Sequence, residues 1–182
     1  KNIEEILSSC TKHKIETIDT AINYEYNNQQ KNISRDLLSK FDIGTKISIK
    51  ENNLKKRDLL DKLLKSLNSS LKNWGKNEFK YIYCHDILEK KNEIELFKEI
   101  SEILKEEGFT KQMGLSIYDT NDINSNIIES IDRIQIPDNL YLQRPYEEIL
   151  FFKKFSLCID VRSIFLQGII PNEIINFKKT IP

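Results

Sequence analysis

The sequence predicts an α/β protein built on a parallel β-sheet. Short apolar runs alternate with helical patterns along the whole of the 182 residues. The runs are almost continuously apolar, as in strands whose two faces are both covered by helices. A doubly wound sheet and a (β/α)8 barrel both satisfy this pattern. The phosphate-binding G-x-G-x-x-G of the first is absent, and polar residues close successive strands, so the barrel is favoured.

Six strands are expected, each from apolar, β-branched or aromatic residues. The first, IETID, is β-branched, the third, FKYIYCH, is rich in aromatic residues, and Pro137 stops the fifth. In order, the expected strands cover residues 15–19, 41–47, 79–85, 111–117, 133–136 and 157–165.

A helical pattern precedes each strand, with apolar residues three or four positions apart. The strongest covers 54–74, where leucines form one stripe, and Gly75 is expected to end it. Gly108 closes another amphipathic helix in the same way. In order, the expected helices cover residues 3–14, 33–38, 54–74, 94–107, 124–131 and 146–155.

The length indicates an incomplete barrel. Complete barrels typically have about 250 residues and eight strands, so a chain with six βα units lacks two. The chain also starts at Lys1 without a methionine. We therefore expect residues 1–182 to be a single, incomplete barrel domain, as a fragment or a retained part of a longer protein.

The composition excludes several classes of partner. Basic and acidic residues number 28 each, which argues against binding to nucleic acid or to a membrane surface. No apolar stretch is long enough to span a bilayer, and no signal peptide opens the chain.

The three cysteines are far apart, which indicates a reducing, cytoplasmic location. No metal site is expected, because Cys10 and His13 lack a second ligand pair.

Four polar residues stand at or just after the ends of the first three strands: Asp19, Tyr24, Lys46 and His85. In a parallel barrel these ends share one rim. A charged lysine there needs a partner, and Asp19 on the neighbouring strand is the expected one. A tyrosine near that lysine has its pKa lowered from about 10. Such a tyrosine suits a general acid that protonates a carbonyl oxygen, with His85 orienting that oxygen or the tyrosine.

Each residue alone has an ordinary explanation. A strand-end aspartate often caps a turn, a lysine is often solvated, and Tyr24 or His85 could serve packing. The order and sequence context of the set, however, resemble the aldo-keto reductases, NAD(P)-dependent enzymes with a (β/α)8 barrel. The family's D-T-A-x-x-Y is similar to the stretch from Asp19 to Tyr24, its T-K to Thr45 and Lys46, and its histidine to His85.

The resemblance implies roles for these and for further residues. Tyr24 would be the acid, with Lys46, Asp19 and His85 completing a catalytic tetrad. Candidates for binding the nicotinamide cofactor are Ser116 in G-L-S, Gln135 in I-Q, and Arg162 with Ser163 in V-R-S-I-F-L-Q-G. Arg162 falls where many members place an aromatic ring against the nicotinamide, and a planar guanidinium can stack there.

The sequence departs from the family in three places. Glu25 replaces a common glycine after the tetrad tyrosine, and Ile117 replaces an asparagine that binds the carboxamide. The family's first and eighth strands have no counterpart here, so the six units correspond to strands two to seven. The eighth strand carries much of the family's adenosine phosphate site, so the choice between NADP and NAD stays open, with NADP preferred.

The resemblance implies a cytoplasmic NAD(P)H-dependent reductase that converts an aldehyde or ketone to an alcohol. The R-S-x-F-L-Q-G motif is similar to that of a bacterial subgroup associated with surface sugars, so a sugar-derived substrate is one candidate. The alternative is a catalytically weak barrel that senses the cofactor or binds another protein. In a third interpretation the strand-end residues have no catalytic role, and the barrel has another function. The oligomeric state is not predicted.

Overall fold

The computed structural model describes residues 3–22, 33–50, 54–123, 125–166 and 169. These residues form one sheet of six parallel strands, whose spatial order, β1 to β6, is their order in the sequence. The strands are β1 Thr17–Asp19, β2 Asp42–Ile47, β3 Tyr81–Cys84, β4 Met113–Ser116, β5 Arg133–Pro137 and β6 Cys158–Arg162.

A helix precedes every strand, as the sequence predicted. The helices are α1 Ile3–Lys12, α2 Arg35–Leu38, α3 Lys56–Trp74, α4 Lys91–Glu106, α5 Ser125–Ile128 and α6 Tyr146–Lys154, and a short 3₁₀ helix, η2, covers Thr120–Asp122. The two glycine stops are confirmed, because Gly75 and Gly108 have φ of 64° and 76° in the left-handed region. None of the helices in the described ranges is both long and apolar enough to cross a bilayer.

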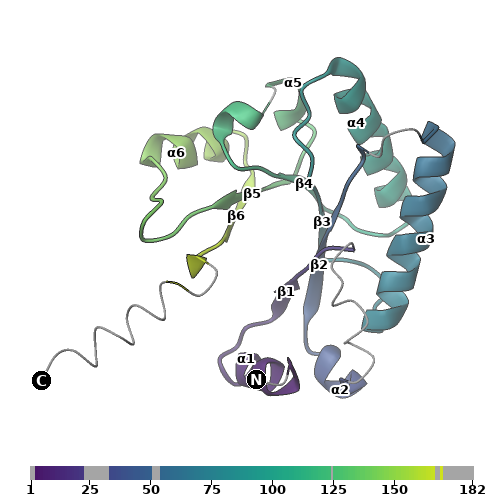
Figure 1. The fold of residues 1–182 in the computed structure, drawn as a ribbon, viewed down its shortest axis with the longest axis vertical. Helices are drawn as coiled ribbons and strands as arrows, with labels where there is room; N and C mark the ends of the chain where they lie inside the picture. Colours follow the sequence, from purple (N-terminus) through teal and green to yellow (C-terminus); the bar gives the residue numbers. More distant parts are fainter. Residues whose placement is uncertain (1–2, 23–32, 51–53, 124, 167–168, 170–182) are drawn as a thin grey trace, which may run out of the picture.

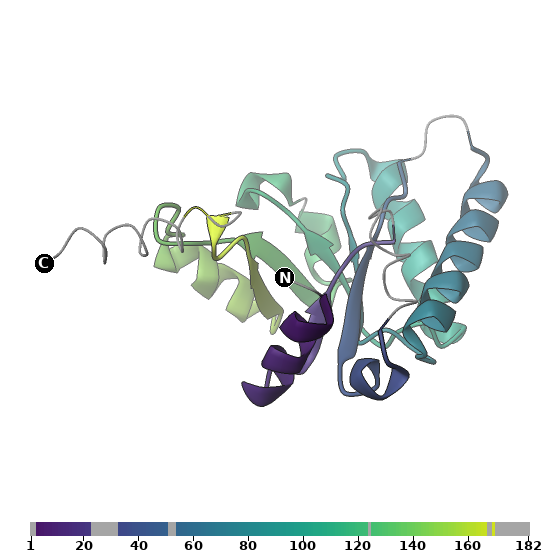
Figure 2. The ribbon, with the colours of Figure 1, turned by 60° about the horizontal axis from the view of Figure 1, so that its bottom comes forward.

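The sheet curls into a half-barrel with the helices outside it. Figures 1 and 2 both show α3 and α4 side by side on the outer face, α6 beside β6, and α1 near β1. Because the strands are parallel and neighbouring in sequence, each carboxyl end meets the next along one rim. The predicted fold class, part of a (β/α)8 barrel, is confirmed.

The apolar core lies between the sheet and α3 and α4. The leucine stripe of α3 packs there, and Leu67 of this stripe is fully buried. Phe97 and Leu104 of α4 belong to the same core and are also fully buried. The inner face of the sheet also packs closely. At Gly44 a Cβ would lie 1.9 Å from the ring of Tyr81. A side chain at Gly44 would therefore displace that tyrosine.

Several elements are shorter than the sequence predicted, and β6 and α5 differ most. We expected the last strand to run to Phe165, but β6 ends at Arg162. The next residue, Ser163, has a φ of 61°, which is outside the β region and turns the chain. The helix α5 has four residues, whereas we expected eight, over 124–131. Both differences arise at element ends, where apolar periodicity does not locate the backbone turn.

Candidate active site

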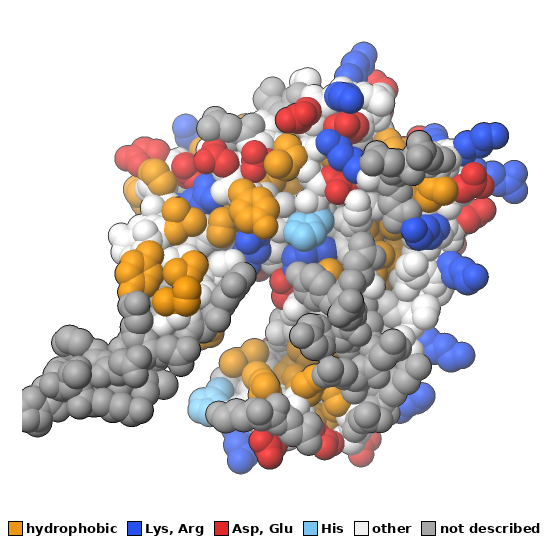
Figure 3. All heavy atoms as spheres, viewed as in Figure 1, with side chains coloured by type: hydrophobic (Ala, Val, Ile, Leu, Met, Phe, Trp, Pro, Cys, Tyr) orange, Lys and Arg blue, Asp and Glu red, His pale blue; other side chains and the backbone are white. Residues whose placement is uncertain are grey.

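The described candidate residues gather at the carboxyl ends of the strands, and we call them the rim site. The rim site consists of Asp19, Lys46, His85, Ser116, Gln135, Arg162 and Ser163. Asp19, Ser116 and Arg162 end β1, β4 and β6, and His85 directly follows β3. Figure 3 shows a histidine side chain next to basic side chains near the middle of the molecular face, at the top of a hollow.

Lys46 and Asp19 form the ion pair that the sequence predicted. The Lys46 Nζ lies 2.5 Å from Asp19 Oδ2 and donates a second hydrogen bond to the Thr20 carbonyl oxygen at 3.3 Å. The lysine side chain is only 5% exposed, whereas that of Asp19 is 35% exposed. A buried ammonium is costly without a counter-charge, and Asp19 supplies that counter-charge to Lys46 at the edge of the barrel interior.

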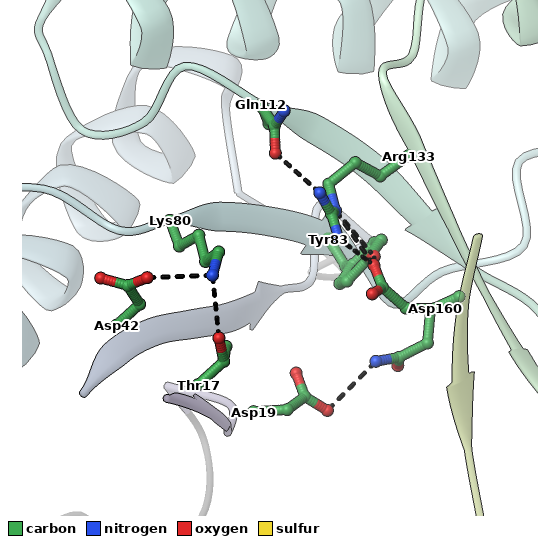
Figure 4. Close-up of polar contacts among 9 residues, drawn as sticks. Thr17, Asp19, Asp42, Lys80, Tyr83, Gln112, Arg133 and Asp160 are labelled. Carbon is green, nitrogen blue, oxygen red and sulfur yellow. Dashed lines mark hydrogen bonds and ion pairs between the residues drawn. The ribbon is translucent and has the colours of Figure 1, made fainter. Parts of the chain in front are cut away.

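Two buried polar side chains extend this pair across the half-barrel. Gln135 Nε2 donates to Asp19 Oδ2 at 3.1 Å, and Ser116 Oγ donates to Gln135 Oε1 at 2.9 Å. Figure 4 shows the bond to Asp19 as a dashed line. Two of the candidates for cofactor binding, Ser116 and Gln135, are therefore in one connected network with the charged pair, which the sequence motifs did not indicate.

His85 is held neutral at the rim. Its backbone N–H donates to the Ile47 carbonyl oxygen at 2.9 Å, which anchors it to β2. Partial loss of hydration lowers the pKa of His85, and the positive charges of Lys46 and Arg162 lower it further, against a smaller opposite effect of Asp86 and Asp19. A neutral imidazole offers one hydrogen-bond donor and one acceptor.

Asp86 was not predicted and stabilises the loop after β2. Its Oδ2 accepts from the backbone N–H of Ile49 at 2.5 Å and of Lys50 at 3.1 Å, and its Oδ1 accepts from Ser48 Oγ at 2.9 Å. These bonds join the residues after Lys46 to the residue after His85. An acidic residue directly after the histidine was the available signal in the sequence.

Arg162 lies on the ring of Tyr118. Its guanidinium carbon is 4.3 Å from the ring centroid, and its Nη2 donates to the Ile117 carbonyl oxygen at 3.2 Å. Nη1 lies 3.4 Å from Ser163 Oγ, the hydroxyl of another cofactor-binding candidate. The Nε atom is buried and has no hydrogen-bond partner among the described residues.

Tyr24, the proposed acid, lies outside the described residues, as does Glu25. The buried Thr45 hydroxyl has no partner within the described ranges. Ile117, in the place of the carboxamide-binding asparagine, is buried with an exposed fraction of 1%. Its apolar side chain packs in the core, so at this position only the backbone contributes a polar contact to the rim.

A second polar cluster, the interior network, lies inside the half-barrel and consists of Tyr83, Gln112, Arg133 and Asp160 (Figure 4). Arg133 donates from Nη2 to Asp160 Oδ2 at 2.6 Å and from Nη1 to Gln112 Oε1 at 2.8 Å. The Tyr83 hydroxyl donates to the same Asp160 oxygen. Burial and the Asp160 carboxylate raise the pKa of Tyr83, so its hydroxyl keeps its proton and acts as a donor.

A curled parallel half-barrel with a buried lysine paired to an aspartate at its carboxyl rim is typical of (β/α)8-barrel proteins, whose sites lie at the strand ends. The sequence model described as "Aldo/keto reductase family" matches residues 2–150. The chain therefore belongs to the aldo-keto reductase family.

Solved structures share this fold at low sequence identity. An aldo-keto reductase from Brucella melitensis is 24% identical with a TM-score of 0.65, over 90% of this chain and 64% of its own. One from Bacillus halodurans, in its holo form, is 18% identical with a TM-score of 0.70, over 91% and 58%. One from Klebsiella pneumoniae, in complex with NADPH, is 15% identical with a TM-score of 0.65, over 88% and 57%.

This chain thus spans about two thirds or less of each of these proteins, between 57% and 64% of their length. A comparison with curated proteins gave no match.

Proposed function

We propose that the protein is an NAD(P)H-dependent oxidoreductase that reduces the carbonyl of a small aldehyde or ketone to an alcohol. The observation that carries the proposal is the ion pair between the buried Lys46 and the partly exposed Asp19 at the carboxyl rim, next to His85. A buried ammonium at a strand end stabilises negative charge that develops on a neighbouring oxygen. Membership of the aldo-keto reductase family supports this chemistry.

In the proposed mechanism, Tyr24 acts as the general acid and gives its proton to the carbonyl oxygen. Lys46, held by Asp19, stabilises the phenolate that remains. His85 is neutral at pH 7 because its pKa is lowered, so its N–H can donate to the carbonyl oxygen and orient it. General acid catalysis of this kind contributes roughly 10²- to 10⁴-fold to the rate.

The residues at the rim fit a nicotinamide cofactor. Ser116 and Gln135 present a buried hydroxyl and amide, the groups that bind a carboxamide, and Arg162 has a buried donor without a partner among the described residues. We propose that these three and Ser163 hold the cofactor, with NADP preferred to NAD. The cofactor, when bound, supplies the hydride, and the protein supplies position and charge. The NADPH complex of the Klebsiella structure supports this cofactor class.

We infer that the substrate is a small carbonyl compound, and sugar-derived carbonyl compounds are one candidate. We also infer that residues 1–182 are one incomplete barrel domain of a cytoplasmic protein. The three cysteines support the location, because they are free thiols, as is usual in a reducing compartment.

One observation favours a second function, a cofactor-sensing or interaction protein of the same family. Ile117 fills the position of the carboxamide-binding asparagine with a buried apolar side chain. Fewer polar contacts would weaken the hold on the nicotinamide and lower turnover. Binding of NADPH, seen as a change in its fluorescence, without reduction of any of several aldehydes would favour this alternative.

The experiment for the main proposal is the substitution Tyr24→Phe in the purified protein. It should abolish aldehyde reduction while the Kd for NADPH stays near that of the parent. Tyr26→Phe is a matched control, because Tyr26 lacks the motif spacing from Asp19, and it should keep its activity. Retained turnover in Tyr24→Phe would remove the role of general acid from this residue.

A further inference from the structure

Arg162, which is partly buried, differs from two other arginines whose side chains are largely buried. Arg133 forms an ion pair with Asp160 at 2.6 Å, and Arg144 forms one with Glu148 at 2.9 Å. Arg162 has no carboxylate within ion-pair distance in the described part of the chain, and its contacts are a ring, a carbonyl oxygen and a hydroxyl. Its positive charge is therefore not neutralised there, whereas Asp19 neutralises that of Lys46.

Tyr118, whose ring lies against the Arg162 guanidinium, is held through both its backbone carbonyl oxygen and its backbone N–H. Arg144, which is 7% exposed, donates from Nη2 to the Tyr118 carbonyl oxygen and from Nε to the Pro137 carbonyl oxygen at 3.1 Å. The Tyr118 N–H donates to Asp122 Oδ2 at 3.1 Å. Tyr118, which is 60% exposed, thus forms a platform for the guanidinium that is fixed at its backbone, and the Ile117 carbonyl oxygen is a further point of attachment for Arg162.

A fixed cation with a spare donor is suited to receive an anion. The guanidinium uses its face on Tyr118 and its Nη atoms on Ile117 and Ser163, while the buried Nε–H has no partner among the described residues. Arginine binds carboxylates and phosphates through the edge of its planar fork. Stacking and anion binding use different parts of the group, so one arginine can do both.

We propose that Arg162 receives an anionic group, a carboxylate or a phosphate, carried by the carbonyl substrate. The proposal rests on the reductase function above and names its substrate class as anionic carbonyl compounds. Arg162 lies at the carboxyl end of β6, on the rim that carries Lys46 and His85. Its charge also acts on the His85 imidazole, which in the proposed mechanism meets the carbonyl oxygen. The anion would therefore bind close to the reacting carbonyl.

The test compares pairs of aldehydes in which one member carries an anionic group and the other does not. The purified protein is assayed with NADPH on butanal and 4-oxobutanoate, and on glyceraldehyde and its 3-phosphate. The readout is the ratio of kcat/KM for the charged substrate to kcat/KM for the neutral one, so each variant serves as its own reference. We expect a ratio above one for at least one pair. A charge-assisted hydrogen bond corresponds to roughly 10- to 100-fold, so the ratio should fall by about this factor in Arg162→Met.

Two further variants support this measurement. Arg162→Lys keeps the charge without the fork, so the ratio should lie between those of the parent and Arg162→Met. Tyr118→Leu removes the platform but keeps the arginine, so the ratio should fall by a smaller factor. An unchanged ratio in Arg162→Met, or in Tyr118→Leu if the first variant does not fold, overturns the proposal.

The same variants separate the substrate's anion from the cofactor's. The Kd for NADPH is measured by its fluorescence. A Kd that rises about tenfold in Arg162→Met, with an unchanged substrate ratio, shows that Arg162 serves the cofactor and not a substrate anion, and overturns the proposal.

A direct binding measurement separates this proposal from the reductase function itself. The Nε–H resonance of Arg162, assigned by its absence in Arg162→Lys, is followed by ¹⁵N NMR while succinate or inorganic phosphate is added. A shift without turnover on any aldehyde supports the anion site and contradicts the reductase function. Without a shift from either anion, the anion site is overturned whether or not the protein reduces neutral aldehydes.

Discussion

The rim site and the interior network are two polar clusters in one half-barrel, and they satisfy their charges differently. In the interior network, Arg133 and the Tyr83 hydroxyl both donate to Asp160, and Arg133 also donates to Gln112 and lies over the ring of Tyr81. At the rim, Asp19 is partly exposed and Arg162 keeps a buried donor without a partner among the described residues. Charged groups whose partners are all supplied by the protein hold strands together, whereas charged groups with an unused hydrogen-bond donor or acceptor are available to a ligand.

The strongest test of this contrast is Lys46→Met. Without the ammonium, nothing stabilises the negative charge on the acid and the substrate oxygen, so kcat/KM for aldehydes should fall by roughly 10³-fold. The free energy of unfolding in urea should change by less than about 1 kcal/mol, because Asp19 is 35% exposed and keeps its bond to Gln135. A large loss of stability with full activity would reverse the roles of the two clusters.

Arg133→Met should have the opposite profile. It leaves Asp160, whose side chain is 29% exposed, without its cation, and breaking such a pair should lower the free energy of unfolding by about 2 to 3 kcal/mol. Urea unfolding followed by circular dichroism measures the change, with Arg162→Met as the matched control at less than about 1 kcal/mol. Equal losses in both variants would show that the interior arginine has no special structural role.

Asp86→Ala tests the link between the loop after β2 and the rim. The variant removes the acceptor of the Ile49 and Lys50 N–H groups, which should cost about 1 to 2 kcal/mol. Amide hydrogen exchange should speed up over residues 48–50, which follow Lys46, more than in α4. Unchanged exchange there would mean that the loop keeps its position without Asp86.

The smallest effect concerns pH and His85. Its pKa is lowered in the folded state below the ordinary value of 6.5, so the unfolded chain binds the proton more readily. The contribution of His85 to stability is therefore intact above pH 6.5 and is lost as the pH falls through the lowered folded pKa. Urea midpoints of the parent and of His85→Asn should thus converge as the pH falls from 7 to 5. Parallel curves would contradict the lowered pKa.

The sequence predicted the sheet and the Lys46–Asp19 pair for the same reason. Strand order follows the chain, so residues that close neighbouring strands come together, and a buried lysine requires a carboxylate. The interior network was not predicted because it joins residues of β3, β5 and β6 through their register across the curled sheet. The Arg162–Tyr118 contact was not predicted either, because it joins the end of β6 to the loop after β4, and apolar periodicity carries no signal for such a contact.

The bond between Gln135 and Asp19 joins residues 116 positions apart in the sequence. Closing so long a loop costs entropy before any contact compensates for it, and the cost grows with the number of residues enclosed. The rim site can therefore form only after β1 meets β5, when most of the sheet is already in place. During refolding, helical circular dichroism should recover first and binding at the rim last, because contacts distant in sequence form slowly.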